Sequence, residues 1–475
     1  MFDLSSDDIT EGPVVRAMLV LAAPLLAQNV VQVLQTVIDL FWLGRLDPDA
    51  VAAVGLVATL QSLVFAVAIW APLVGTQVLV AQRIGADDIP GARNRVFVGL
   101  VTAILLAVVL GVVGVVGARP VIDLLTSTRP ESVAGAVPDY AVAYFTVTMV
   151  GLPVLVLADT TEAAYVGWGD SRMALYMNLL AVGVNLVLDP LLIFGYFGFP
   201  ELGVQGAALA TVAGYGLGGV LGLWFALAGR NGGMLTRAAA RFDLPTAREL
   251  LAVGLPISGQ QLAKQSADLL LVLVAFTLGG PAGLVAYTVG HRVATLAVIP
   301  SGSLQQAAQS IIGQNLGAGF VGRAHRATWL GAILAGGVLG VVGLVQWLIP
   351  STLTTLFVPT LGEEALSLSI EYLRVLAYSY PAIGVAYLFQ AGFNAAGRTT
   401  TSFVASLLQY WGIRLPVAVV GGGLVAAGLG LSMGVSAVFW AVTGSNLLAA
   451  VGLGAYYNYS AENGMLDRAA EAAAA

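Results

Sequence analysis

The sequence predicts an all-α polytopic membrane protein with twelve transmembrane helices in two six-helix lobes. Hydrophobic residues make up 58% of the 475 residues and charged residues only 10%. A soluble domain carries about a quarter charged residues, so this chain cannot cover a soluble surface of its size. Apolar stretches of about 20 residues, the length a helix needs to cross the bilayer, recur along the chain. The second half of the chain also repeats the first.

Each expected span is a continuous apolar stretch bounded by charges, Gly or Pro. The approximate ranges are 16–42, 52–82, 96–117, 138–165, 172–196, 203–228, 249–278, 283–313, 327–350, 368–394, 401–425 and 430–456. The preceding segment, 1–15, is acidic and lacks the basic start and cleavage site of a signal peptide, so we expect the first span to be retained.

The arginines indicate the orientation of these spans. If the N-terminus is cytoplasmic, the outside loops hold only Arg45, Arg119 and Arg129, and most other arginines fall inside. Cytoplasmic loops carry the excess of positive charge, so both termini are expected inside the cell. The expected parts are a cytoplasmic tail (1–15), an N-lobe (16–228), a cytoplasmic linker (229–248), a C-lobe (249–456) and a low-complexity cytoplasmic tail that is disordered (457–475).

The two halves share one plan. At an offset of 232 residues, Pro24 matches Pro256 and Gln28 matches Gln260; at 228, Tyr144 matches Tyr372 and Pro153 matches Pro381. Six spans per half is an even number, so the two repeats insert the same way up, related by an axis along the membrane normal. Two such bundles are typical of a carrier with a central cavity, although duplication also produces channels and scaffolds.

The first span carries a polar stripe. Gln28, Gln32, Gln35 and Asp39 fall within an arc of about 60° on a helix. The stripe must face a cavity or another helix. Hydrogen bonds between helices are the alternative role for the glutamines. A carboxylate within a span is costly and usually functional, which makes Asp39 the stronger candidate.

The fifth span contributes a second acid. Asn185 and Asp189 are four residues apart and share a helix face, and Pro190 disturbs the local hydrogen-bond ladder. Their oxygens suit Na⁺, and the acids suit a proton. The hydroxyl of Thr211, on the sixth span, is placed to complete such a site. A buried acid pair that only joins helices is the alternative.

The fourth span carries Tyr144, Asp159 and Glu162. Tyr144 and Glu162 are five turns apart, so they share one azimuth. If this face lines a cavity, the cavity is acidic and attracts organic cations. Alternatively, Asp159 approaches the cytoplasmic interface, where charge is solvated.

The C-terminal half differs from this pattern. Lys264 and Asp268 are four residues apart, and we expect an internal ion pair. Arg414 falls at the repeat position of Leu186. His291 and Arg292 lie in the eighth span, with no role indicated by the sequence.

Composition excludes several other functions. The chain has no Cys and only two His, which leaves no disulfide or thiolate site and argues against a His-built metal centre. A net charge of −6 argues against nucleic acid as a partner. No catalytic motif is present, so we expect neither an enzyme nor a cofactor.

Several sequence motifs, taken together, resemble one transporter family. They are the paired AQRIGADD and GQNLGAGF, TVIDLFWLGRLDPDAVAAVGL, GWGDSRMA and NLVLDPLLIFG. Over about residues 10–460 the chain resembles the multidrug and toxic compound extrusion (MATE) family, and in particular its archaeal and DinF-like branch.

The resemblance implies a V-shaped, rocking-lobe antiporter of the cell membrane that exports organic cations in exchange for Na⁺ or H⁺. The family's N-lobe cation site maps onto Asp39, Asn185, Asp189 and Thr211. Tyr144 resembles a tyrosine of the archaeal members, and Pro24 a proline at which the first span bends. The NorM-like branch has a carboxylate where this chain has Lys264, which argues against a second cation site in the C-lobe.

We therefore expect a secondary active multidrug efflux antiporter. Its partners would be the lipid bilayer and small organic cations, and the protein would be a monomer. Gln28, Gln32, Gln35, Tyr144, Asp159 and Glu162 would line the substrate cavity. The alternative is a lipid-linked oligosaccharide flippase of the same superfamily, whose cavity usually carries several Arg. A non-transporting scaffold or sensor is disfavoured by the short loops.

Overall fold

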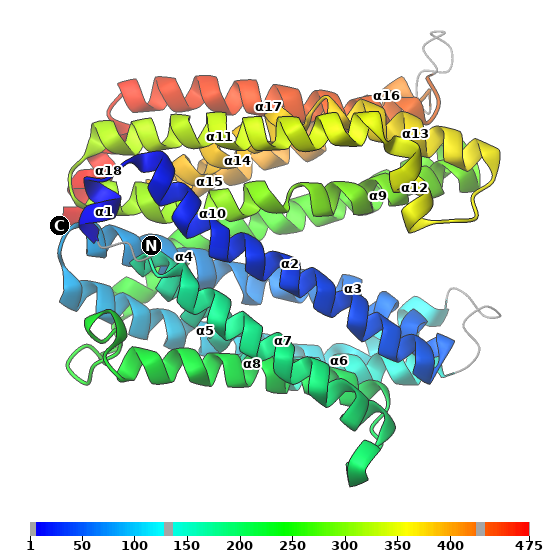
Figure 1. Ribbon diagram of the computed structural model, residues 1–475, viewed down its shortest axis with the longest axis horizontal. Helices are drawn as coiled ribbons and strands as arrows, with labels where there is room; N and C mark the ends of the chain where they lie inside the picture. Colours follow the sequence, from blue (N-terminus) through cyan, green and yellow to red (C-terminus); the bar gives the residue numbers. More distant parts are fainter. Residues whose placement is uncertain (1–5, 128–135, 424–432, 475) are drawn as a thin grey trace. The chain divides into compact units, whose positions relative to one another are not determined.

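The structure is a computed structural model that describes residues 6–127, 136–423 and 433–474. Within these ranges the regular secondary structure is helical (Figure 1). Arg129 lies outside the described residues, as does the end of the expected span 401–425 and the start of 430–456.

Ten helices among the described residues are long and apolar enough to cross a membrane. The other expected spans lie in longer or broken helices. Helix α9 (Leu244–Ala297) contains both 249–278 and the beginning of 283–313, with a kink at Gly280, whose φ is 56°. The stretch 368–394 is divided between α13 (Glu363–Ala377) and α14 (Tyr380–Ala395).

The remaining helices follow in chain order. They are α1 (Ser6–Thr10), α2 (Val14–Leu46), α3 (Pro48–Ala68), α4 (Trp70–Gly85), α5 (Ile89–Ser127), α6 (Val137–Trp168), α7 (Ser171–Phe194), α8 (Val204–Leu227), α10 (Ile299–Gly317), α11 (Val321–Leu348), α12 (Pro350–Phe357), α15 (Thr399–Leu407), α16 (Leu415–Gly421), α17 (Ser436–Glu462) and α18 (Met465–Ala474). Short 3₁₀ turns η1 (Tyr196–Gly198) and η2 (Arg230–Gly232) and a π-helical segment η3 (Leu408–Arg414) complete the list.

The chain divides into two compact units. Among the described residues, unit 1 holds those from 23 to 258, and unit 2 holds those from 6 to 22 and from 259 to 474. The divisions lie inside α2 and α9, next to Pro24 and Pro256 respectively. Proline lacks a backbone N–H and weakens the helix at that point. Two helices at repeat-related positions therefore each belong to both units.

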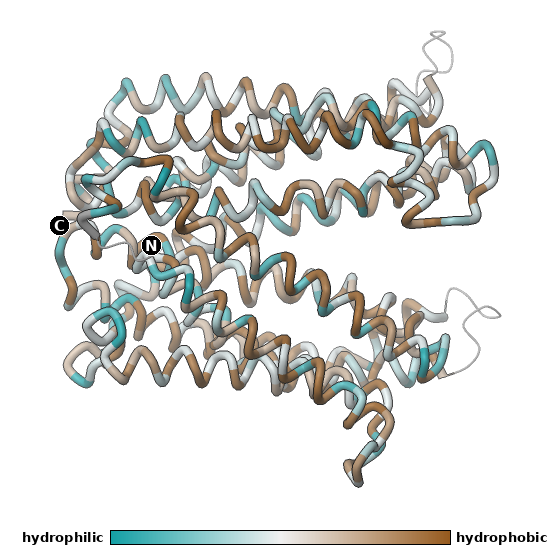
Figure 2. The backbone as a smooth tube through the Cα atoms, in the orientation of Figure 1, coloured by the Kyte–Doolittle hydropathy of each residue, from teal (hydrophilic) through white to brown (hydrophobic). Residues whose placement is uncertain are grey.

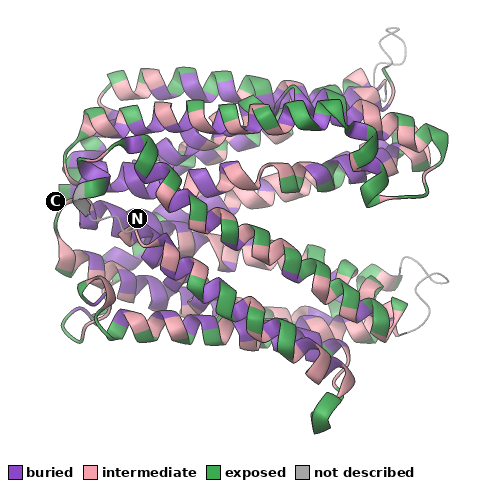
Figure 3. Cartoon of the chain, viewed as in Figure 1, coloured by how far each residue is buried: buried purple, intermediate pink, exposed green. Residues whose placement is uncertain are grey.

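The outer faces of the helices are apolar. Exposed valines follow one another along α5, each with 46–74% of its surface accessible: Val108, Val109, Val112, Val113 and Val116. Figure 2 shows apolar residues along the long helices, and Figure 3 shows exposed residues along the same helices. An apolar surface of this kind suits lipid and not water, and the chain is a multi-pass membrane protein.

The C-terminal tail is helical, although its low-complexity composition predicts disorder. Helix α18 buries Met465, Leu466, Ala469, Ala470 and Ala473 on one face. It packs against α10, α11 and α17 of unit 2. The alanines are strong helix formers, and their spacing gives a continuous apolar stripe that needs a partner.

Candidate functional site

Helices α7 and α8 lie side by side in unit 1 (Figure 1). A Cβ atom added at Gly214 would collide with the carbonyl oxygen of Ala181, and one added at Gly218 with that of Met177. Glycines four residues apart let two helix backbones approach closely within a membrane. This close packing brings the polar side chains of α7 against α8.

The first cluster consists of Asp39, Asn185, Asp189 and Thr211. Asn185 Nδ2 donates to Asp189 Oδ1 and to Thr211 Oγ1, each at 3.3 Å. Thr211 in turn donates to the Ala207 carbonyl at 3.1 Å. The Asp39 carboxyl, arriving from α2, lies within hydrogen-bonding reach of Asp189. The structure thus brings together all four residues that the sequence assigned to the cation site.

Several oxygen atoms of this cluster lack a hydrogen-bond donor. Among the described residues, Asp39 Oδ1, Asn185 Oδ1 and Asp189 Oδ2 are buried without a hydrogen-bond partner. Two adjoining carboxylates repel each other unless a proton or cation lies between them. Leaving buried acceptors unpaired is also costly. The donor set is entirely oxygen, which fits Na⁺ or a proton and not a soft transition metal.

Tyr144 lies beside this first cluster, within electrostatic range of Asp39 and Asp189. The sequence expected Tyr144 and Glu162 to line one face together. They do share helix α6, but 18 residues separate them by about 27 Å along the helix axis. Glu162 therefore belongs to a different group of side chains.

The second cluster consists of Gln28, Gln32, Glu162 and Asn178. Gln28 Nε2 donates to Glu162 Oε1 at 2.5 Å, and Asn178 Nδ2 donates to Glu162 Oε2 at 2.7 Å. Gln32 donates to Asn178 Oδ1 at 2.7 Å. Amide groups thus donate to both carboxylate oxygens of Glu162. Gln28 and Gln32 make hydrogen bonds between helices, which was the alternative role stated for the glutamines.

The remaining members of the predicted cavity take different places. Asp159 lies near Glu162 and interacts with it electrostatically. Gln35 is buried, and within the described ranges it makes no hydrogen bond to either cluster. Tyr215 on α8 lies within electrostatic range of Asp39 in the first cluster and of Glu162 in the second.

Sequence reasoning missed Asn178 and Tyr215. Asn178 lies seven residues before Asn185, two helical turns along the same face of α7, and this spacing was a usable signal. Nothing in the sequence pattern distinguishes Tyr215 from an ordinary core aromatic residue.

An ion pair fixes the start of α7, outside the membrane-spanning helices. Asp170 caps α7 by accepting from Met173 N at 3.3 Å. It also accepts from Arg230 at 2.6 and 3.1 Å and from Asn231 at 3.1 Å. The hydrogen bond with Asp170 raises the pKa of the Arg230 guanidinium. The motif GWGDSRMA thus anchors the helix that carries Asn178, Asn185 and Asp189.

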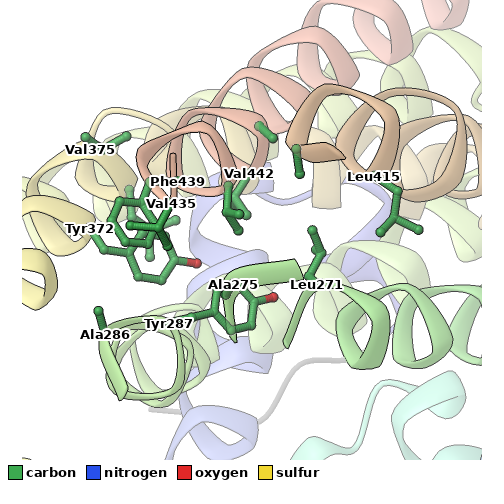
Figure 4. Packing of buried hydrophobic residues seen from close by; sticks show 14 of the residues in the cluster. Leu271, Ala275, Ala286, Tyr287, Tyr372, Val375, Leu415, Val435, Phe439 and Val442 are labelled. Atoms are coloured by element: carbon green, nitrogen blue, oxygen red, sulfur yellow. The ribbon is translucent and has the colours of Figure 1, made fainter. Parts of the chain in front are cut away.

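Unit 2 places apolar residues where unit 1 has the first cluster. The repeat relates Asp39 to Leu271, Tyr144 to Tyr372 and Thr211 to Phe439. These three residues of unit 2 belong to one buried cluster (Figure 4). Tyr372 stacks on Phe439 with 4.5 Å between ring centroids. Unit 2 therefore has a hydrophobic core at the positions that correspond to Asp39, Tyr144 and Thr211 of unit 1.

The expected ion pair between Lys264 and Asp268 does not form. No nitrogen–oxygen contact within 4 Å joins them in the part of the chain that the structure describes. Instead, Asp268 lies 3.9 Å from Arg414 Nη1. The prediction was wrong. Four-residue spacing places Lys264 and Asp268 on one helix face but does not require them to touch, and η3 brings the guanidinium of Arg414 toward the same carboxylate.

The fold and the two polar clusters define a polytopic membrane transporter built from two repeats. A family model described as MatE matches residues 24–191 and 256–420, and the chain belongs to the MATE family. Members of this family are transporters and not enzymes. The two matched segments begin at Pro24 and Pro256, the prolines next to the divisions between the units.

Individual relatives agree with this assignment. The chain is 28% identical to the "Probable multidrug resistance protein YoeA" of Bacillus subtilis, over 85% of this chain and 86% of that protein. It is 27% identical to a "FAD transporter" of Shewanella oneidensis, over 94% and 95% of the two chains. A solved outward-facing multidrug resistance MATE family transporter superposes with a TM-score of 0.86 at 24% identity, covering 97% and 98% of the two chains.

Proposed function

We propose that this protein is a secondary active efflux antiporter that exports organic cations in exchange for Na⁺ or H⁺ bound in unit 1. The observation that carries the proposal is the group of unpaired buried oxygens on Asp39, Asn185 and Asp189. A site of this kind gains a large electrostatic stabilisation when a cation or proton arrives.

Exchange requires that the coupling ion and the substrate oppose each other. Cation binding at the first cluster neutralises Asp39, which lies on α2. The second cluster, to which α2 contributes Gln28 eleven residues before Asp39, supplies Glu162 of α6 as an anionic partner for an organic cation. We propose that ion binding shifts α2 and loosens the contacts of Gln28 and Gln32, so that substrate affinity falls in the ion-bound state.

The proposed location is the cell membrane, with both termini cytoplasmic and the protein a monomer. Two features support the common side of the termini. Helices α1 and α18 both pack against α10 within unit 2. Arg323 also donates to the carbonyls of Ile9 and Gly12, which ties the N-terminal segment to the start of α11. The distribution of arginines indicates that this side is cytoplasmic.

The experiment is efflux of a fluorescent organic cation from proteoliposomes under an imposed Na⁺ or pH gradient. We expect wild-type protein to export the dye under one of the two gradients and Asp39→Asn to lose this export. Asp139→Asn is the matched control, because this exposed carboxylate only pairs with Arg119 at the surface. It should export like wild type.

Two outcomes would contradict the proposal. Full export by Asp39→Asn would remove the first cluster from the coupling mechanism. No export by folded wild-type protein under either gradient would favour the flippase alternative. The acidic residues of unit 1 and the names of the relatives argue against that alternative.

A further inference from the structure

The second cluster has a counterpart in unit 2 that keeps one of its hydrogen bonds. The repeat relates Gln28 to Gln260 and Glu162 to Gln390. Gln260 Nε2 donates to Gln390 Oε1 at 3.2 Å, just as Gln28 donates to Glu162. The hydrogen bond survives, but its acceptor has lost the negative charge.

Two further positions change charge in the same direction. The repeat relates Asp159 to Tyr387 and Gln32 to Lys264. Unit 2 has therefore lost both acids of this region and gained a lysine. The electrostatic neighbours of Lys264 include Tyr387 and Tyr410, so the replaced positions lie together in space.

A second cation reinforces the positive charge. Arg414 stacks over the Tyr410 ring at 4.2 Å and is 6% exposed. It donates to Ser445 Oγ at 2.9 Å and to Asn446 Oδ1 at 2.7 Å, both neutral acceptors. The π-helical segment η3 carries both Tyr410 and Arg414. Such π-helical turns often occur at functional sites because they redirect side chains.

The charge of this region is incompletely balanced. Asp268 is the only carboxylate among the groups that act electrostatically on Lys264. It lies 3.9 Å from Arg414, beyond an ordinary hydrogen bond. Lys264 itself makes no hydrogen bond within the described ranges, and it is only half-buried. His291 also faces this group electrostatically.

We propose that Lys264, flanked by Tyr387 and Tyr410, binds the carboxylate of a zwitterionic substrate, with Arg414 as a buried positioning residue. Lys264 and Arg414 carry two positive charges against the one negative charge of Asp268, and one substrate carboxylate would balance the excess. Ammonium and phenol groups supply the hydrogen-bond donors that such a group needs. The inference rests on the proposed export function and names a residue of unit 2 that would distinguish compounds with a carboxylate from compounds without one.

The test compares two dyes that differ only in this group, tetramethylrhodamine and its methyl ester. Fluorescence anisotropy with the purified full-length protein in detergent gives the affinity for each. We expect Lys264→Gln to weaken binding of the carboxylate dye about tenfold and of the ester less than about twofold. Lys264→Arg should keep the preference. Arg292→Gln, which removes an exposed cation from the same helix, should change neither affinity.

A second measurement does not depend on a variant folding. Lys264 is the only lysine in the chain, so reductive [¹³C]methylation of the whole protein labels this side chain and the N-terminal amine alone. The methylated amine keeps its positive charge. We expect the carboxylate dye to shift the lysine methyl signal and the ester to leave it in place.

Three results would overturn the proposal. They are equal weakening of both dyes by Lys264→Gln, identical effects of both dyes on the lysine signal, and failure of the wild-type protein to bind the carboxylate dye. A failure of the export proposal is distinguishable. It would appear as absence of ion-driven efflux of the ester, while the preference for the carboxylate dye in binding would remain.

Discussion

Asn185 on α7 donates a hydrogen bond to the hydroxyl of Thr211 on α8, at 3.3 Å. This bond joins the two helices at the first cluster and orients the amide, so that its oxygen stays unpaired beside Asp189.

The prediction is that Thr211→Val weakens coupling-ion affinity about tenfold, because the amide loses an acceptor. The measurement is the ion concentration that gives half-maximal efflux. Thr211→Ser keeps the hydroxyl and should stay near wild type; a serine variant as weak as valine would contradict this role.

Close packing of α7 on α8 makes a prediction about stability. Gly214→Ala places a methyl group against the Ala181 carbonyl, which should destabilise the protein by about 1–3 kcal/mol. The midpoint of thermal unfolding in detergent measures this. Gly183→Ala, also within this helix pair, meets nothing within 4 Å and should be neutral or slightly stabilising. Equal midpoints for the two variants would refute the packing argument.

The anchor at the start of α7 can be divided into its parts. Asp170→Asn keeps a good N-cap but loses the charge opposite Arg230, whereas Asp170→Ala loses both. We expect Asp170→Ala to lower the free energy of unfolding by about 1–2 kcal/mol relative to the wild-type protein. Asp170→Asn should lower it by less. Thermal unfolding of the purified variants gives the order. If alanine and asparagine cost the same, the cap contributes nothing.

Glu162 carries the negative charge of the second cluster. In Glu162→Gln, one of the two donors, Gln28 or Asn178, would face an amide nitrogen in place of an oxygen. We expect affinity for the cationic methyl ester to fall about threefold to tenfold, because the proposed partner of the cation is lost. Anisotropy measures this, with the exposed Glu364→Gln as control. Unchanged affinity would show that Glu162 has only a structural role.

Much of this structure could be predicted from the sequence. Apolar stretches long enough to span a bilayer, recurring throughout, indicated the helices, and the offsets of 232 and 228 residues indicated two repeats. The same periodicity brought Asn185 and Asp189 onto one face. Helical spacing is a local property, so it is visible without a structure.

Side-chain partners were less predictable. Lys264 and Asp268 share a face of α9, yet Arg414 competes for the carboxylate from η3, and a π-helical turn leaves no sequence signal of its own. Asn178 was missed because a single amide in a span is also ordinary helix contact. The prediction of a disordered tail was wrong for α18, because it used the low-complexity composition of the segment and ignored the helical spacing of its buried residues. In each case the deciding interaction is between segments distant in the chain.

The paired hydrogen bonds of Gln28 with Glu162 and of Gln260 with Gln390 bear on the history of the molecule. After the ancestral gene doubled, each copy could inherit the same backbone and vary only the charge displayed on it. A few positions, such as Glu162 with Gln390 and Gln32 with Lys264, suffice to make this polar group acidic in unit 1 and basic in unit 2. Selection could thus tune which compounds are exported without rebuilding either bundle.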